Sequence, residues 1–133
     1  MFAIEKREYG FLLTFDGFID AKEMQQWFDQ SEDVLADAPS SFGVLVDMRT
    51  LIPLHADAQE VMQNGQRLYR EAGMKRSAVI LNHPVTTIQF QRLAQLSGIY
   101  EWERYIDASR RPNWEEVGLA WLEDGVDPDQ PSH

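Results

Sequence analysis

The sequence contains no cysteine and few basic residues, and both shortages limit what the protein can do. Without cysteine the chain forms no disulfide, no thiolate metal site and no cysteine nucleophile. Only 12 lysine and arginine residues stand against 22 aspartate and glutamate residues, which gives a formal net charge of -10. Because so acidic a surface repels phosphate backbones and anionic lipid head groups, we expect no binding to nucleic acid or to membranes.

Long apolar segments and targeting signals are also missing. No apolar run approaches the roughly 20 residues that cross a bilayer. The first ten residues, MFAIEKREYG, lack the basic-then-apolar order of a signal peptide. The sequence therefore predicts a cytoplasmic protein. Its 133 residues fit one domain with a substantial core.

Familiar catalytic and cofactor-binding motifs are absent. The sequence has no G-x-G-x-x-G or G-x-x-x-x-G-K-[ST] segment, so nucleotide binding of the usual kinds is not expected. It also has no G-x-S-x-G segment, which excludes the common nucleophile elbow. His55 and His83 have no companions at metal-ligand spacing. We therefore expect neither a cofactor nor a metal.

Two continuous apolar runs are typical of strands that are buried on both faces, the usual condition of central parallel strands. The first run is FGVLV (42–46), which stops at Asp47, and the second is SAVIL (77–81). Open α/β sheets place their sites at the carboxyl ends of such strands. Asp47 and the loop beyond it are therefore the first candidates for a functional site.

Apolar residues recur at helical spacing in two long segments. Asp20, with Glu23 three residues further on, predicts a capped helix over residues 20–37. A second helix is expected to begin near Asp57, as its N-cap, and to end at residue 72. Gly65 lies inside the apolar stripe of this helix, and we attribute it to close packing against the sheet.

Shorter elements complete the pattern. Two β-prone runs flank Tyr9-Gly10 and predict an antiparallel hairpin. The remaining expected elements are a helix over 86–96, an edge strand over 104–107 and a last helix after Asn113. This alternation predicts an α/β fold with a single sheet of about five strands. The sheet should be mostly parallel with an N-terminal antiparallel hairpin, and the helices should pack against it.

Residues 1–123 are expected to form one domain. From residue 124 to residue 133 the chain is polar and contains proline, which is typical of a disordered tail. No internal repeat and no interior linker divides the chain.

Two segments carry a resemblance to a known family. FDGFIDAKEM (15–24) leads into the first long helix, and GVLVDMRTL (43–51) is a strand that reaches an aspartate and continues into a loop. Together with the hairpin, they resemble the STAS domain family, most closely its SpoIIAA-like branch of small bacterial proteins. The resemblance covers roughly residues 5–123. It implies a SpoIIAA-like fold and a role as a regulatory module that binds proteins.

The same resemblance raises the question of phosphorylation. In the anti-sigma-factor antagonists of this family, a phosphorylatable serine lies at the start of the helix after that strand. The corresponding positions here are His55, Ala56 and Asp57, and none is serine or threonine. The resemblance therefore implies a module without the phosphoserine. Asp57 either imitates the phosphorylated state by its charge at a helix N-terminus or simply caps the helix.

The candidate binding residues gather at the predicted carboxyl ends of the strands. His55 and His83 each follow such an end, and we expect them to line one crevice with Asp47 and Arg49. The leading hypothesis is a non-catalytic module that presents residues 48–56 and the start of the next helix to a protein partner. Leu54 and Asp57 belong to this surface. An enzyme that uses His55 or His83 near Asp47 is an alternative.

A carrier is the second alternative. Abundant Met, Phe and Trp would suit a cavity for a small apolar or amphipathic ligand between sheet and helices. Five aromatic residues near the C-terminus either form a small core or cover a binding surface: Tyr100, Trp102, Tyr105, Trp114 and Trp121. Exposed edge strands also invite pairing with a second copy, so the sequence allows both a monomer and a homodimer.

Overall fold

The computed structural model of the protein describes residues 1–130. Within them the chain forms one five-stranded sheet, four α-helices and one 3-10 turn. The strands are β1 (Phe2–Arg7), β2 (Gly10–Gly17), β3 (Phe42–Leu51), β4 (Met74–Leu81) and β5 (Glu103–Asp107). The helices are α1 (Ala21–Leu35), α2 (Ala56–Ala72), α3 (Pro84–Ser97) and α4 (Trp114–Asp124), and the turn is η1 (Tyr100–Trp102).

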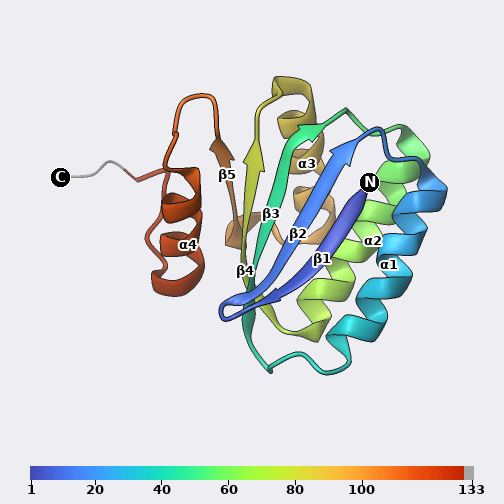
Figure 1. The fold of residues 1–133 in the computed structure, drawn as a ribbon, viewed down its shortest axis with the longest axis horizontal. Coiled ribbons are helices and arrows are strands. Elements are labelled where there is room, and N and C mark those ends of the chain that lie inside the picture. The colour runs from blue at the N-terminus through green and yellow to red at the C-terminus, as the bar shows by residue number, and fades with distance from the viewer. Residues whose placement is uncertain (131–133) are drawn as a thin grey trace.

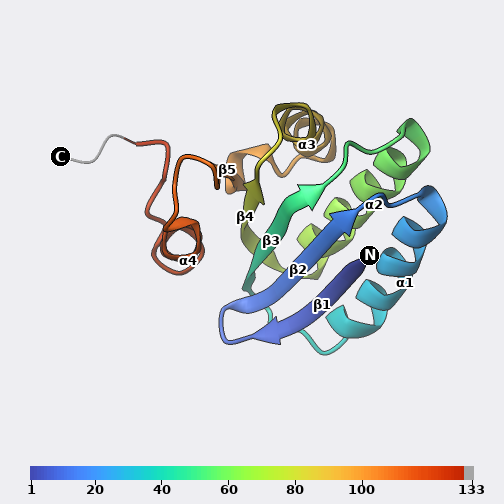
Figure 2. The ribbon, with the colours of Figure 1, turned by 45° about the horizontal axis from the view of Figure 1, so that its top comes forward.

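The strands follow one another across the sheet in chain order, β1-β2-β3-β4-β5. β1 pairs with β2 in antiparallel orientation, and every later neighbour is parallel. Helices α1, α2 and α3 cover one face, whereas α4 lies against the other (Figures 1 and 2). The expected α/β fold, with its mostly parallel sheet and N-terminal hairpin, is confirmed.

The hairpin turn depends on a glycine. Gly10 has a φ of 144°, which side chains rarely allow, and a Cβ there would lie 2.0 Å from the carbonyl oxygen of Gly43. This close approach brings β2 against β3 at their first residues. The turn therefore fixes where the parallel part of the sheet begins.

The central strand is longer than its apolar run indicates. β3 continues from Phe42 to Leu51, so Asp47 lies inside the strand and not at its carboxyl end. The extension pairs with β2 beyond a bulge, where Asp16 is opposite Thr50 and Gly17 is opposite Leu51. Because β2 pairs with polar as well as apolar residues of this extension, the end of the apolar run does not mark the end of the strand.

Two expectations about α2 are wrong in detail. The helix begins at Ala56, and the N-cap position belongs to His55, so Asp57 lies in the first turn instead of capping it. Gly65 does pack closely, but against Trp27 of α1 and not against the sheet. A Cβ at Gly65 would lie 2.1 Å from the Trp27 ring. Helices α1 and α2 can therefore approach each other only because this position has no side chain.

The sheet separates two apolar cores of unequal size. The larger core lies between the sheet and α1, α2 and α3, and Phe11, Trp27 and Phe90 are among its most buried members. The smaller core lies beneath α4. Its buried members are Leu45, Ala78, Ile80, Ile106, Trp121 and Leu122. Both faces of β3 and β4 are thus covered, as their continuous apolar runs predict.

The C-terminal segment differs from the expected tail. Asp124 ends α4, and the following residues pack back against the domain: Arg104 donates two hydrogen bonds to Asp127, at 2.9 and 3.1 Å. Arg111 donates to the carbonyl oxygen of Pro128 at 2.8 Å. The rest of the expected tail, 131–133, lies outside the described residues. Across residues 1–130, no helix is long and apolar enough to cross a membrane.

Candidate functional site

The loops that follow β2 and β3 lie side by side at the carboxyl edge of the sheet. The backbone N–H of Ile52 donates to the carbonyl oxygen of Gly17 at 3.1 Å, which joins the two loops. Each loop exposes a large apolar side chain: Phe18 is 54% exposed and Ile52 is 52% exposed. Exposed apolar side chains that lie together are more informative than scattered ones, because such patches mark interaction sites.

The start of α2 adds polar groups beside these apolar ones. The His55 ring lies edge-to-face with the Phe18 ring, with 5.5 Å between their centroids. Asp57 is exposed in the first turn, where its carboxylate accepts a hydrogen bond from the backbone N–H of Ala58 at 2.8 Å. A carboxylate at this position is stabilised by the partial positive charge of the helix N-terminus. We call Phe18, Ile52, His55 and Asp57 the carboxyl-edge patch.

The loop between β3 and α2, which carries Ile52 and His55, is anchored through Leu54. The Leu54 side chain is only 4% exposed and belongs to the core. The Leu54 N–H donates to the Gln89 side chain at 2.8 Å, and Gln89 and Gln59 both donate to the Leu54 carbonyl oxygen, at 3.0 and 2.9 Å. Leu54 therefore anchors the loop to α2 and α3, and its side chain is not presented at the surface.

Asp47 and Arg49 lie on the other face of the sheet. Their side chains form a bidentate ion pair with N–O distances of 3.0 and 2.9 Å. The Arg49 guanidinium also stacks 4.3 Å from the centre of the Trp114 ring, which belongs to α4. Hydrogen bonding to Asp47 raises the pKa of Arg49. The pair thus links β3 to α4, away from His55.

His83 has a structural partner of its own. It occupies the N-cap of α3, and its Nδ1 accepts a hydrogen bond from the backbone N–H of Val85 at 3.2 Å. The side chain borders a surface hollow of about 420 Å³ between α3 and β5. The structure therefore distributes the six candidate residues over several surfaces, and only His55 and Asp57 lie together in the carboxyl-edge patch.

The sequence alone did not single out Phe18, and it included Ile52 only as a member of the loop 48–56. Phe18 lies between the Asp16-Gly17 turn and the helix cap Asp20, and an apolar residue in such a polar connection is a usable sign of exposure. Ile52 carries no such sign, because it follows directly on the apolar end of β3. Its exposure depends on where the extended strand stops.

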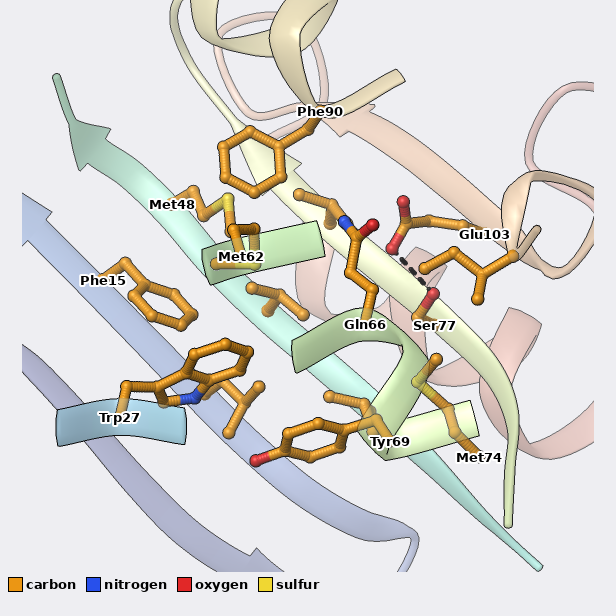
Figure 3. Close-up of a pocket in the computed structure, with 15 residues that line it drawn as sticks. Phe15, Trp27, Met48, Met62, Gln66, Tyr69, Met74, Ser77, Phe90 and Glu103 are labelled. Atoms are coloured by element: carbon orange, nitrogen blue, oxygen red, sulfur yellow. Dashed lines mark hydrogen bonds between the residues drawn. The ribbon is translucent and has the colours of Figure 1, made fainter. Parts of the chain in front are cut away.

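The main core contains a small cavity beneath α2 (Figure 3). Its volume is about 30 Å³, which is room for about two water molecules. Trp27, Met62 and Phe90 are among the side chains that line it. An amphipathic ligand requires several hundred cubic ångströms. The carrier hypothesis therefore gains no support from this cavity.

A buried carboxyl group lies beside the same cavity. Glu103 is only 4% exposed, and it accepts a hydrogen bond from the Ser77 hydroxyl at 2.8 Å (Figure 3). It accepts a second hydrogen bond from the Tyr105 hydroxyl. Nearby, Ser97 donates to Gln66 at 2.8 Å. Burial raises the pKa of Glu103 to about 7, although both hydroxyl donors act in the opposite direction. Arg104, the next residue, pairs with Asp127 instead.

The aromatic group near the C-terminus divides into core and surface. Trp121 is 6% exposed, and its indole N–H donates to the Ser77 carbonyl oxygen at 3.0 Å. Trp114 packs against the smaller core. Tyr100 and Trp102, in contrast, are 43% and 51% exposed. Trp114 and Trp121 therefore belong to the small core, and Tyr100 and Trp102 are exposed; a binding role for the exposed pair stays a prediction.

Two solved structures are similar to the whole fold. One is an uncharacterized protein of the DUF3478 family with a SpoIIAA-like fold from Shewanella loihica PV-4, with 18% identity and a TM-score of 0.61 over 92% of each chain. The other is an anti-sigma factor antagonist from Mycobacterium paratuberculosis, with 16% identity and a TM-score of 0.56. That match covers 90% of this chain and 93% of the antagonist. No protein-family model matches the sequence, and no curated protein matches it.

The protein therefore has a SpoIIAA-like fold. The resemblance to STAS domains is confirmed at the level of architecture, over nearly the whole chain. Sequence identities below 20% support similarity of the fold alone and not of the function, because one fold supports many unrelated functions.

Proposed function

We propose that the protein is a non-catalytic regulatory module that acts in the cytoplasm by binding a partner protein through its carboxyl-edge patch. The observation that carries this proposal is the joint exposure of Phe18 and Ile52 beside the charged start of α2. Apolar side chains surrounded by polar groups are the usual composition of a transient protein interface. The fold shared with an anti-sigma factor antagonist supports a partner of the anti-sigma-factor type.

Two further observations support the non-catalytic part of the proposal. Asp47 pairs with Arg49 on the α4 face, and His83 caps α3, so the hydrogen bonds of both side chains go to partners other than His55. General acid–base catalysis needs its groups within hydrogen-bond reach of one substrate.

Asp57 gives the patch a permanent negative charge. In this proposal the carboxylate occupies the region where antagonists of this type carry a phosphoserine, so the module stays in one charge state. Asp57→Asn would keep the local hydrogen bond to the backbone N–H but remove the charge. Partner binding that depends on the charge would therefore weaken in this variant.

Loss of the two apolar side chains is expected to weaken partner binding strongly without unfolding the protein. We expect the double variant Phe18→Ala/Ile52→Ala to bind its partner at least tenfold more weakly, because apolar anchors dominate interface energies. Its thermal stability should change little, since both side chains are largely exposed. The measurement is quantitative affinity purification from extract of the source organism, followed by binding titration of the recovered partner.

A matched control is Val126→Ala, which removes an equally exposed apolar side chain (58% exposed) from the C-terminal segment. A partner that the wild type and this control retain, and that the double variant loses, would support the proposal. If every recovered partner binds the double variant as tightly as the wild type, the patch is not the interface.

A further inference from the structure

Exposed apolar side chains concentrate on α3 and η1. Among the described residues, nine large hydrophobic side chains are exposed, and five of them come from these two elements. The five are Val85, Ile88, Leu96, Tyr100 and Trp102. The carboxyl-edge patch is made of other residues, which come from the loops before α1 and α2 and from the start of α2.

The surface of α3 also differs from that of the other helices in charge. α3 has 14 residues and one charged side chain, Arg92, which donates a hydrogen bond to Gln59 of α2. α1 has nearly the same length, 15 residues, but carries Lys22, Glu23, Asp29, Glu32 and Asp33. In a chain with a net charge of -10, an uncharged and partly apolar helix face is the exception. This helix face is suited to contact with another molecule and not to exposure to solvent.

A groove runs between this helix and the last strand. One hollow of about 550 Å³ is bordered by Tyr100, Trp102 and Asp129, and another of about 420 Å³ is bordered by Ile88 and Asp107. Gln91 and Tyr105 border both hollows, so the two meet there. The Tyr105 hydroxyl oxygen also lies 3.3 Å from the Phe90 carbonyl oxygen, which places this floor residue against α3. We call the combined feature the α3–β5 groove.

The charged groups of the groove are mostly acidic. Five carboxyl groups border it, of which Glu103 is buried and four reach the surface: Glu101, Asp107, Asp127 and Asp129. Two arginines lie beside them and are outnumbered by the carboxylates. Arg104 pairs with Asp127 at 2.9 Å and lies 3.8 Å from Asp129, and Arg110 lies 3.8 Å from Asp107. Asp107 and Asp129 keep side chains that are 51% and 65% exposed. A ligand of complementary charge is therefore positive.

The backbone edge of β5 is partly closed to a further strand. The Arg104 guanidinium donates to the carbonyl oxygens of Glu101 and Glu103, at 2.9 and 3.0 Å. These hydrogen bonds occupy acceptors that an added strand would need. Recognition in the groove must therefore come from side chains.

We propose that the α3–β5 groove binds an extended, basic peptide segment of a partner protein. Apolar side chains of the peptide pack against Ile88, Tyr100 and Trp102, and lysine or arginine side chains reach Asp107 and Asp129. An extended chain advances about 3.3 Å per residue. A segment of about six to eight residues would extend over about 20–26 Å. The residues of this site differ from those of the carboxyl-edge patch, and the proposal does not depend on the function proposed for that patch.

The test starts from selection with a displayed library of random eight-residue peptides on the full chain. We expect enriched peptides to alternate basic and apolar residues. The best peptide, labelled with fluorescein, is then titrated by fluorescence anisotropy. Binding should weaken about tenfold in Trp102→Ala, about fivefold in Asp107→Asn/Asp129→Asn, and further with added salt.

The control separates the groove from the general acidity of the chain. Glu32→Gln/Asp33→Asn also removes two negative charges, but from exposed positions on α1. It should leave the peptide affinity within twofold of the wild-type value. Equal weakening by the control and by the groove pair would overturn the proposal. So would selection that yields no peptide, or peptides without basic residues. Sedimentation that shows a dimer dissociated by Trp102→Ala would also overturn it, because the occupant would then be a second copy.

Discussion

Replacing Glu103 with glutamine is expected to remove most of the dependence of folding stability on pH between pH 5 and pH 8. In the wild type, the free energy of unfolding should fall by about 3 kcal/mol as the pH rises through this range. In the variant, the fall should be about 1 kcal/mol or less.

The direction follows from the pKa of the buried group. Burial raises the pKa of Glu103 from 4.5 to about 7 in the folded protein. Its contribution to stability is therefore complete below the unfolded pKa, near 4.5, and is lost as the pH rises through about 7. The protonated carboxyl keeps its partners, because the hydroxyls of Ser77 and Tyr105 can each accept as well as donate. A glutamine amide offers the same donor and acceptor pair without a charge.

Urea unfolding at pH 5, 6, 7 and 8 measures this effect. The matched control is Glu101→Gln, which changes an exposed carboxylate two residues earlier in the chain. We expect the control to keep the slope of the wild type. A wild-type stability that is constant from pH 5 to pH 8, or that rises with pH, would show that Glu103 is ionised in the folded protein at all these values.

Adding a methyl group at Gly65 is expected to destabilise the protein by about 2 kcal/mol or more. In an exposed helix interior the same change stabilises by about 1 kcal/mol, because alanine has the higher helix propensity. Here the new Cβ would lie 2.1 and 2.2 Å from two atoms of the Trp27 ring. That ring is stacked on Tyr69, with a centroid distance of 5.7 Å, and meets the edge of Phe15, so it has little freedom to move.

Thermal and urea unfolding of Gly65→Ala test this expectation. Asn64→Ala, one residue earlier on the exposed side of α2, controls for helix propensity and should be neutral or slightly stabilising. In the Trp27→Phe background, Gly65→Ala should cost less than in the wild type, because phenylalanine lacks the atoms that clash. A stabilised Gly65→Ala would mean that α1 and α2 can separate without loss of packing.

The order of elements and the larger part of the core could be predicted from local patterns. Asp20 caps α1 as the spacing to Glu23 indicates, with the Glu23 N–H donating to Asp20 at 2.8 Å. The apolar runs in β3 and β4 are buried between two layers of helices. In these segments the local preference and the tertiary packing agree.

The details that were wrong depend on contacts between distant segments. β3 extends past Asp47 because β2 offers a partner on the far side of a bulge. Gly65 faces Trp27, which lies in another helix. Nothing within either segment indicates these neighbours.

The sequence placed the candidate site at the carboxyl edge of the sheet, but it did not show which residues share a face there. Asp47 and Arg49 are two residues apart on β3, so both side chains face α4. His55, in contrast, precedes a helix on the opposite side of the sheet. The sequence indicated all three but not the face to which each belongs. The sequence did not single out Glu103, for a related reason. β5 alternates Glu103, Tyr105 and Asp107 with Arg104 and Ile106, and this pattern does not show which carboxylate is buried.

The unequal division of the two cores has a consequence for local opening of the native state. Helix α4 closes a core of six buried residues, whereas the other three helices share a much larger one. Detaching α4 would expose little apolar surface and would leave the sheet paired, so it requires less free energy than global unfolding. Amide protons of α4 should consequently exchange with solvent through a partial opening, before those of β3 and β4. The domain would then behave as a stable two-layer body, the sheet with α1, α2 and α3, and one detachable helix, whose removal uncovers the far side of the central strands.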